Sequence, residues 1–365
     1  MNTRRDRAAD AEDVNVTPTP PDARGFRVAL DAMGGDHAPE EIVRGGIAAA
    51  REGATVLLVG VPERIQPELA ADGADGLPIS IVPSDDAIDE AEQPALALRR
   101  KPRASVLVAT GLVKEGAADA VVSMGSTGAT MASAHFLLGT QENLDRPVLG
   151  GPALGYAPNT IWLDMGANVD ARPPQFLDFA AIGVATARAY LEIENPTVAL
   201  LNVGEESTKG SRQVKEAYTA LQTRSGLNFI GNVEAHEAVQ GKANVVLSDG
   251  FVGNALLKYS EGLGVAIARD LGERLAPELG PDRARDIAGD VFRKINVLET
   301  AGGPILGVNG IVIVGHGRAR APMVHGAIRT ARLLKEHDIV AAIQAELSAI
   351  HARNQSTAPA GSAGA

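Results

Sequence analysis

The chain has 365 residues, 45% of them hydrophobic and 22% charged, which is enough apolar material for one large α/β domain or two smaller ones. Its formal charge is 34 minus 45, or −11, which argues against non-specific nucleic-acid binding. It has no cysteine, which excludes a disulfide framework, a thiolate metal site and a cysteine nucleophile. No apolar run approaches the roughly 20 residues that span a bilayer, and the first residues lack a signal-peptide core. We therefore expect a cytoplasmic protein.

The two ends of the chain differ in composition from its middle. Residues 1–25 and 351–365 are polar and lack helical or strand periodicity, so both are interpreted as disordered tails around a domain at 26–350. Within that domain short apolar runs alternate with helical patterns, which is typical of a mainly parallel sheet covered on both faces. Many runs end in Gly, Asp, Asn or Ser, and we expect these carboxyl ends to meet at one edge of the sheet, where ligands bind. The runs are VALDAMGG, TVLLVG, ISIVPS, ASVLVAT, DAVVSMG, TIWLDMG, TVALLNVG, NFIGNV, ANVVLSDG and IVIVGHG.

The first of these runs ends in a turn that contains Asp31, Gly34, Gly35 and Asp36, and a helix is expected to open at Pro39. Adjacent glycines permit positive φ and a close approach to a ligand, so the turn predicts a binding loop. An ordinary tight turn in which Asp36 caps the helix is equally compatible with the spacing.

A second loop, SMGSTGAT, follows the run DAVV and precedes a predicted helix. Gly125, Ser126, Thr127 and Gly128 would place backbone N–H groups and two hydroxyls at a helix N-terminus, which favours a phosphate or anion site. The lysine of a Walker A loop is absent. Plain N-capping by Ser or Thr would use the same atoms without any ligand.

Later strand ends supply further polar side chains. Asn168 follows TIWLDMG, while Asp249 and Asn254 follow ANVVL. Lys209 lies between two glycines after TVALLNVG, where it could pair an anion or simply be a solvated loop residue. His316 follows IVIVG, and no pair of histidines has a metal-binding spacing.

Two segments stand apart from this pattern. Arg99, Arg100 and Lys101 belong to a basic cluster that ends the predicted helix PALALRRK; it complements a helix C-terminus or forms a docking site for an acidic partner. In 256–298 the strand pattern lapses, and a helical hairpin broken near Pro277–Pro281 is expected. The hairpin could cover the core, form a subunit interface or rest on a membrane surface.

Taken together, these stretches resemble the phosphate acyltransferase family of bacterial phospholipid synthesis. The resemblance extends from Phe26 to about Leu334. It is carried by LDAMGGDHAPE, DRPVLGG, WLDMGANVDARP, LLNVGEESTKG, FIGNVEAHE, LSDGFVGNALLK, GGPILGVNGIVIVGHGRA and HGAIRTA. Two positions depart from the family pattern: Ser126 stands where the family loop usually has Asn, and Arg318 where it often has Ser.

The resemblance implies an acyltransferase that moves a fatty acyl chain from acyl carrier protein to inorganic phosphate, giving the acyl phosphate used in glycerol-3-phosphate acylation. It also implies a three-layer α/β/α fold like those of isopropylmalate dehydrogenase and phosphotransacetylase, a homodimer, and no metal or cofactor. Loose association with the inner membrane face and with a glycerol-3-phosphate acyltransferase would follow.

The residues fit such a reaction. Phosphate is anionic at neutral pH and a thiol leaves readily, so positioning and charge stabilisation matter more than a strong base. We expect the 125–128 loop to hold phosphate and Lys209 to neutralise charge. Asn168 and Asn254 would orient groups, and Asp31 and Asp36 would shape the first loop. Gly34, Gly35, Asp249 and His316 complete the predicted substrate site.

Three other functions are compatible with parts of the pattern. An NAD-dependent decarboxylating dehydrogenase would share the fold, but the GxGxxG fingerprint is missing. A phosphotransacetylase would use coenzyme A thioesters in place of the carrier protein. A non-catalytic membrane-associated scaffold for lipid synthesis would tolerate the loss of Lys209.

Overall fold

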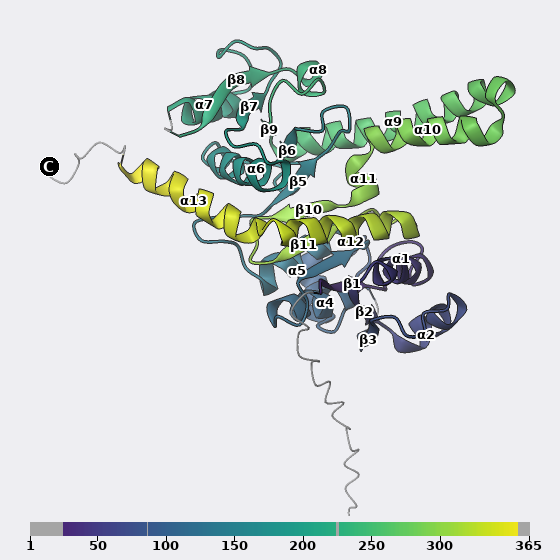
Figure 1. The fold of residues 1–365 in the computed structure, drawn as a ribbon. Helices are drawn as coiled ribbons and strands as arrows, with labels where there is room; N and C mark the ends of the chain where they lie inside the picture. Colours follow the sequence, from purple (N-terminus) through teal and green to yellow (C-terminus); the bar gives the residue numbers. More distant parts are fainter. Residues whose placement is uncertain (1–24, 86, 224–225, 357–365) are drawn as a thin grey trace, which may run out of the picture.

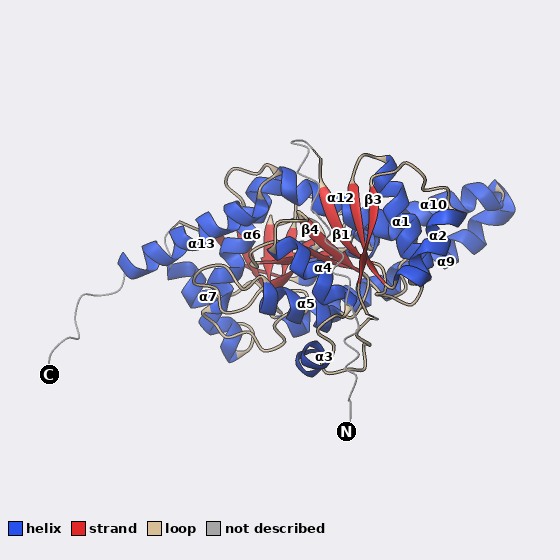
Figure 2. Ribbon diagram, turned by 90° about the horizontal axis from the view of Figure 1, so that it is seen from below, coloured by secondary structure: helices blue, strands red, loops and turns tan. Residues whose placement is uncertain are grey.

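The computed structural model describes residues 25–85, 87–223 and 226–356. Its centre is an eleven-stranded sheet in the order β3-β2-β1-β4-β11-β10-β5-β6-β9-β7-β8, and helices cover both faces (Figures 1 and 2), which confirms the three-layer α/β/α expectation. The strands are β1 Arg27–Asp31, β2 Thr55–Gly60, β3 Ile79–Pro83, β4 Ala120–Ser123, β5 Val148–Pro152, β6 Ile161–Leu163, β7 Thr197–Leu201, β8 Asn228–Val233, β9 Val245–Leu247, β10 Gly303–Leu306 and β11 Ile311–Val314. The helices are α1 Glu40–Arg51, α2 Pro62–Ala71, α3 Pro94–Arg100, α4 Ser105–Lys114, α5 Thr127–Leu137, α6 Gln175–Leu191, α7 Arg212–Thr223, α8 Ala235–Ala238, α9 Gly250–Leu279, α10 Pro281–Ile295, α11 Val297–Ala301, α12 Ala321–Glu336 and α13 Ile339–Ser356.

Alternation along the strands divides the core between the two faces. Val28 and Leu30 of β1 belong to the cluster under α1, α6 and α12, whereas Ala29 between them belongs to the cluster under α4 and α5. All three side chains are fully buried. A strand buried on both faces reads as a continuous apolar run. The sequence therefore indicated where the strands are, but not which residues point to which side of the sheet.

The direction of the strands corrects one expectation. Strands β3, β2, β1, β4 and β11 are mutually parallel, and so are β6, β9, β7 and β8. Between these two groups, β10 pairs antiparallel with β11 and β5, and β5 pairs antiparallel with β6. Three successive reversals leave the two groups pointing in opposite directions. The prediction that all carboxyl ends meet at one edge is therefore wrong.

Individual elements also differ from the sequence-based prediction. The run ASVLVAT forms helix α4, not a strand, because its buried residues Ser105, Val106, Ala109 and Thr110 follow helical spacing. Strands β5 and β10 were not predicted, since glycine and proline make up much of VLGGP and GPIL and depress strand propensity. Helix α13 runs to Ser356, beyond the predicted domain end at 350; residues 1–24 and 357–365 of the predicted tails lie outside the described residues.

The predicted hairpin is confirmed as α9 and α10, which extend together away from the sheet (Figure 1). Gly280, at φ 80°, separates them within the predicted break, while Pro277 lies inside α9. Helix α9 begins at Gly250, earlier than the predicted 256, because Asp249 caps it. Across the described ranges, no helix is both long and apolar enough to cross a bilayer.

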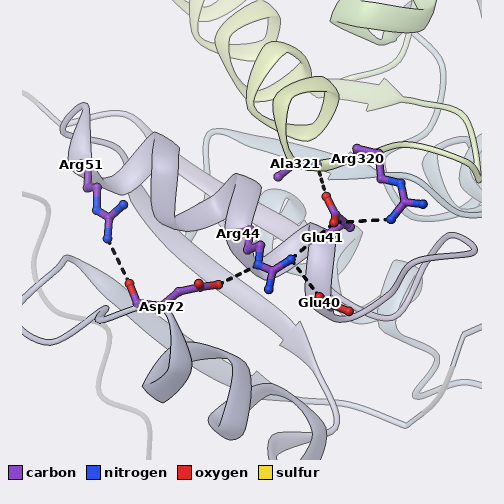
Figure 3. Close-up of polar contacts among 7 residues, drawn as sticks. All are labelled: Glu40, Glu41, Arg44, Arg51, Asp72, Arg320 and Ala321. Carbon is purple, nitrogen blue, oxygen red and sulfur yellow. Dashed lines mark hydrogen bonds and ion pairs between the residues drawn. The ribbon is translucent and has the colours of Figure 1, made fainter.

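Polar contacts connect helix α1 to the N-terminal end of helix α12 (Figure 3). Glu41 of α1 accepts a hydrogen bond from Ala321 N at 2.8 Å and pairs with Arg320 at 3.5 Å. The bond from Ala321 is the main reason that the pKa of Glu41 is lowered. Arg44, one turn further along α1, bonds Asp72 after α2 at 3.1 Å. The contacts of Glu41 hold the start of α1, after the β1 loop, against the start of α12, after the β11 loop.

Candidate active site

A buried carboxylate organises the loop after β1. Asp31 accepts hydrogen bonds from Ser123 Oγ at 2.6 Å and from the backbone N–H groups of Met33 and Gly34 at 3.2 and 3.1 Å. Burial raises its pKa, and these hydrogen bonds oppose the shift. A Cβ on Gly34 would lie 2.8 Å from Gly125 N, so only glycine allows the loops after β1 and β4 to touch. Asp31 therefore holds the turn after β1 to the end of β4.

The rest of the first loop packs against the loop after β11. Asp36 is exposed, and its N–H donates to the carbonyl of Gly317 at 2.7 Å. Gly35 has φ 102° and approaches the same carbonyl. Helix α1 has Pro39 at its N-cap and no side-chain cap, so the alternative in which Asp36 caps this helix is not what the structure shows.

A second buried carboxylate, Asp164, organises the loop after β6. It accepts from the N–H groups of Leu149, Gly166, Ala167 and Asn168 at 2.6–3.1 Å, and from Asn168 Nδ2 at 2.9 Å. Burial raises the pKa of Asp164 against these bonds. The carboxylate thereby fixes Asn168, which is 4% exposed.

The loop after β4 delivers the N-terminus of α5. Ser126 caps this helix by accepting from Ala129 N at 3.3 Å, and Gly125 N–H donates to Ser123 Oγ at 3.1 Å. The Ser126 hydroxyl and the Gly125 N–H group are thus occupied by hydrogen bonds within the loop. Thr127 and Gly128 occupy the first helical turn, where backbone N–H groups have no partner within the helix.

One face of α9 carries polar side chains towards the loop after β11. Asn254, Lys258 and Glu261 are spaced i, i+4 and i+7, so they share that face. Lys258 Nζ is 3.0 Å from Glu261 Oε2 and 3.4 Å from His316 Nε2, and His316 Nε2 is 2.9 Å from Glu261 Oε1. The three residues form a closed triangle, called here the Lys-Glu-His cluster. Asp249 caps α9 through Val252 N at 2.8 Å.

Contacts within this cluster stabilise the ionised form of Glu261. Burial raises the pKa of Glu261, but its bonds to His316 and Lys258 outweigh burial and lower it overall. The Glu261 side chain is 6% exposed, whereas that of Lys258 is 50% exposed. Glu261 therefore stays ionised and holds a solvent-accessible ammonium group and an imidazole in place.

These elements surround a cavity of about 610 Å³. Thr127 and Gly128 line it from α5, Asn168 from the loop after β6, and Lys258 and His316 from the Lys-Glu-His cluster. It lies between the two oppositely directed halves of the sheet, beside the short antiparallel strands. Its other lining residues are Met131, Ala132, His135, Asp145, Arg146, Pro147, Leu149, Gly166, Ala167, Asn254, Leu257, Leu298, Gly303, Val314 and Gly315.

The structure thus brings together five of the predicted site residues, namely Thr127, Gly128, Asn168, Asn254 and His316. The other predicted site residues do not line this cavity: they are Asp31, Gly34, Gly35, Asp36, Gly125, Ser126, Lys209 and Asp249.

Lys209 is the largest departure from the predicted arrangement. It is exposed in the loop after β7, two strands beyond β6, where its carbonyl accepts from Asn202 Nδ2 at 3.1 Å and its side chain lies over Gly204. The sequence placed it beside the 125–128 loop because all strand ends were expected at one edge. The loop after β6 reaches the cavity, but β9 lies between β6 and β7, so the Lys209 loop follows a strand farther from β4.

Lys258 and Glu261 were missed by the sequence analysis. Both lie in a helix that looked like an ordinary amphipathic hairpin. The available signal was their spacing from Asn254, which was already singled out: residues four and seven positions later share its face.

The N-terminal end of α3 lies close to the cavity, and the basic cluster lies at the C-terminal end of the same helix. Helix α3 packs against α5, and a Cβ on Gly128 would lie 2.8 Å from Pro94 Cγ. Arg99 and Arg100 are exposed at the end of α3, whereas Lys101 pairs with Glu92. Cations in the last turn complement the helix dipole, so that alternative is compatible with the structure.

Comparison with known proteins decides the family. A family model described as "Fatty acid synthesis protein" matches residues 26–342. The phosphate acyltransferase of Desulforamulus reducens is 44% identical over 327 residues, covering 88% of this chain and 97% of that protein. The phosphate acyltransferase of Thermosynechococcus vestitus is 43% identical over 326 residues, covering 87% and 94%. The chain belongs to the phosphate acyltransferase family.

Membership makes the protein an enzyme of the acyltransferase class. The fold agrees with this assignment. A phosphotransacetylase from Streptococcus pyogenes matches with a TM-score of 0.55 at 20% identity, covering 85% of this chain and 94% of that one. The EutD phosphotransacetylase from Staphylococcus aureus matches with a TM-score of 0.53 at 18% identity, covering the same shares. At such identities the likeness concerns the fold alone.

Proposed function

We propose that this phosphate acyltransferase family member transfers a long-chain acyl group from acyl carrier protein to inorganic phosphate, releasing acyl phosphate and free carrier thiol. The observation that carries the proposal is the composition of the 610 Å³ cavity. An N-terminal helical turn, an ammonium group and amide side chains converge there, and all of them favour a phosphate anion.

The reaction needs a phosphate oxygen to attack the thioester carbonyl, forming a C–O bond and a tetrahedral oxyanion. The C–S bond then breaks, and the thiolate leaves and takes up a proton from solvent. We assign phosphate binding to the α5 N-terminus at Thr127 and Gly128, and charge stabilisation to Lys258. In this assignment Lys258 replaces Lys209, because Lys258 lines the cavity.

Glu261 is a positioning residue in this scheme. It is buried behind Lys258 and His316 and bonds both, so it keeps them oriented towards the cavity. The two buried aspartates are also positioning residues, because their oxygens are occupied by loop N–H groups. The scheme therefore contains no strong base, and a phosphate that is already anionic needs none.

The partners follow from the same proposal. Arg99 and Arg100, exposed at the C-terminal end of α3, would dock the acidic carrier protein. A homodimer, a cytoplasmic location with peripheral contact at the inner membrane face, and transfer of the product to a glycerol-3-phosphate acyltransferase complete it.

The test supplies purified protein with inorganic phosphate and either hexadecanoyl-[acyl carrier protein] or hexadecanoyl-coenzyme A. Acyl phosphate is trapped with hydroxylamine, and the released thiol is titrated. We expect equimolar hydroxamate and thiol that depend on phosphate, with a higher kcat/KM for the carrier-protein donor. A higher kcat/KM for the coenzyme A donor would instead assign a phosphotransacetylase-like reaction, and no product from folded protein would reject the acyl transfer.

A further inference from the structure

A second cavity, of about 580 Å³, lies beside the proposed phosphate site. It differs from the first in chemistry, because aliphatic and aromatic side chains form most of its wall. Trp162 on β6, Leu256 on α9 and Val239 after α8 are examples. The complete lining is Ala153, Leu154, Tyr156, Trp162, Met165, Ala235, His236, Val239, Leu256, Leu257, Tyr259, Ser260, Leu263 and Ile295.

The two cavities adjoin along α9. Leu257 lines both, and its neighbour Lys258 lines only the phosphate cavity. On the opposite side, Met165 lines the apolar cavity while the next residue, Gly166, lines the polar one. A single turn of α9 and a single step of the β6 loop thus separate a charged compartment from an apolar one.

From this arrangement we infer that the apolar cavity is the subsite for the acyl chain, with Leu257 at its junction with the phosphate site. The identity of the occupant rests on the proposed function. An acyl thioester or acyl phosphate has a polar head joined to a long apolar tail, and the paired compartments reproduce this division. The cavity volume falls within the roughly 300–1,000 Å³ typical of small-molecule sites.

Two neighbouring features favour a chain over a polar ligand. The side chains of Ala153, Trp162 and Met165 are buried and belong to one apolar cluster, so a polar group placed among them would lose hydrogen bonds to water. Tyr259 and Leu263 of α9 lie at the same cavity and are 69% and 42% exposed. Burial of such apolar surface by a chain is favourable.

The subsite contains its own spectroscopic probe, because Trp162 is the only tryptophan in the sequence. Bromine atoms quench indole fluorescence on close approach. We would titrate the full-length protein with 9,10-dibromooctadecanoate, using unbrominated octadecanoate as the reference. Saturable quenching by the brominated chain alone, reversed by excess octadecanoate, is the expected result.

Ser260→Phe adds bulk at the cavity wall, and Ser348→Phe makes the same change at an exposed position of α13. Overpacking should weaken chain binding about 10-fold in Ser260→Phe and leave it unchanged in Ser348→Phe. In the transfer assay Ser260→Phe should raise KM for a hexadecanoyl donor but not for a butanoyl donor. Val239→Phe serves as a second wall variant if Ser260→Phe does not fold.

Several outcomes would overturn the inference. One is the absence of quenching in the wild-type protein, and another is quenching of equal affinity in both wall variants. If wall variants change the oligomeric state by light scattering while quenching stays unchanged, the apolar face belongs to contact with a second copy. Quenching that behaves as expected, in a protein that forms no acyl phosphate, would reject the proposed function and leave the chain subsite standing.

Discussion

Two lysines compete for the role of charge stabiliser, and replacing each by alanine separates them. Lys258 lines the phosphate cavity and is held by Glu261 at 3.0 Å. Lys209 is exposed in the loop after β7 and does not line that cavity. We expect Lys258→Ala to impair acyl transfer strongly and Lys209→Ala to have little effect.

The size of the effect follows from the exposure of Lys258. Removing one group that stabilises developing charge typically lowers kcat about 10²–10³-fold, or about 2.7–4 kcal/mol. The Lys258 side chain is 50% exposed, so solvent screens its charge more than in a closed site. We therefore expect the lower end of this range, about 10²-fold, and a change within about 3-fold for Lys209→Ala.

The assay measures acyl phosphate as hydroxamate over a series of phosphate concentrations. Circular dichroism and thermal unfolding confirm that each variant is folded; Lys258→Ala should fold, because Glu261 keeps its 2.9 Å contact with His316. Glu261→Gln is the matched third variant. It keeps the size of the side chain but removes the charge that orients Lys258, so it should lower kcat less than Lys258→Ala.

The opposite ranking of the two lysines would refute this reasoning. A loss of about 10²-fold in Lys209→Ala, with Lys258→Ala near wild type, would mean that the reacting groups meet at the carboxyl end of β7. Equal losses in both variants would place the phosphate between the two loops, and the cavity would then have to close during the reaction.

Three further predictions concern packing, pH and partner choice. Gly253→Ala should lower the free energy of unfolding by at least about 2 kcal/mol, because its Cβ would lie 1.9 Å from the Asp164 carbonyl oxygen. Gly262→Ala in the same helix, with open space around it, should raise the free energy of unfolding by about 0.5–1 kcal/mol. Urea unfolding of the two variants compares these effects. Burial, partly opposed by His351, raises the pKa of Asp178 to about 6. The folded state therefore retains a proton that the unfolded chain loses near 3.9, so stability should fall as pH rises from about 4 to 6, and Asp178→Asn should remove that slope. Arg100→Glu should raise KM for the carrier-protein donor about 10-fold without changing KM for the coenzyme A donor, and equal changes would reject the docking role.

The sequence predicted the strands well where burial on both faces leaves an uninterrupted apolar run, as in Val28–Leu30. It failed where the energy comes from partners far along the chain. Strand β10 consists of Gly303–Leu306 and forms because β11 and β5 lie on either side of it. Its local propensity is poor, so tertiary pairing overrides the local signal. The run at Ser105 was misassigned because a short buried helix and a buried strand have similar compositions.

The site prediction likewise succeeded where the signal is local and failed where it depends on distant parts of the chain. The loops at Thr127 and Asn168 were found because strand, glycine and polar residue follow one another locally. Whether these loops meet depends on strand direction, and direction is set by the antiparallel pairing of β5 and β10, which local patterns do not reveal. The sequence could therefore propose polar loops, but it could not choose between Lys209 and Lys258.

Two buried aspartates, Asp31 and Asp164, anchor loops in opposite halves of the sheet. The Asp31 loop does not line the cavity, but it contacts the loop after β4 that leads to Thr127 and Gly128. Asp31 ends β1 and Asp164 directly follows β6, and each accepts hydrogen bonds from backbone N–H groups of the loop there. Because β1 and β6 point in opposite directions, these two loops approach the short central strands from opposite ends. Burial raises the pKa of both carboxyls, and their oxygens are occupied by loop N–H and side-chain donors. The chemistry is therefore left to groups that face the cavity, and the aspartates determine where those groups stand.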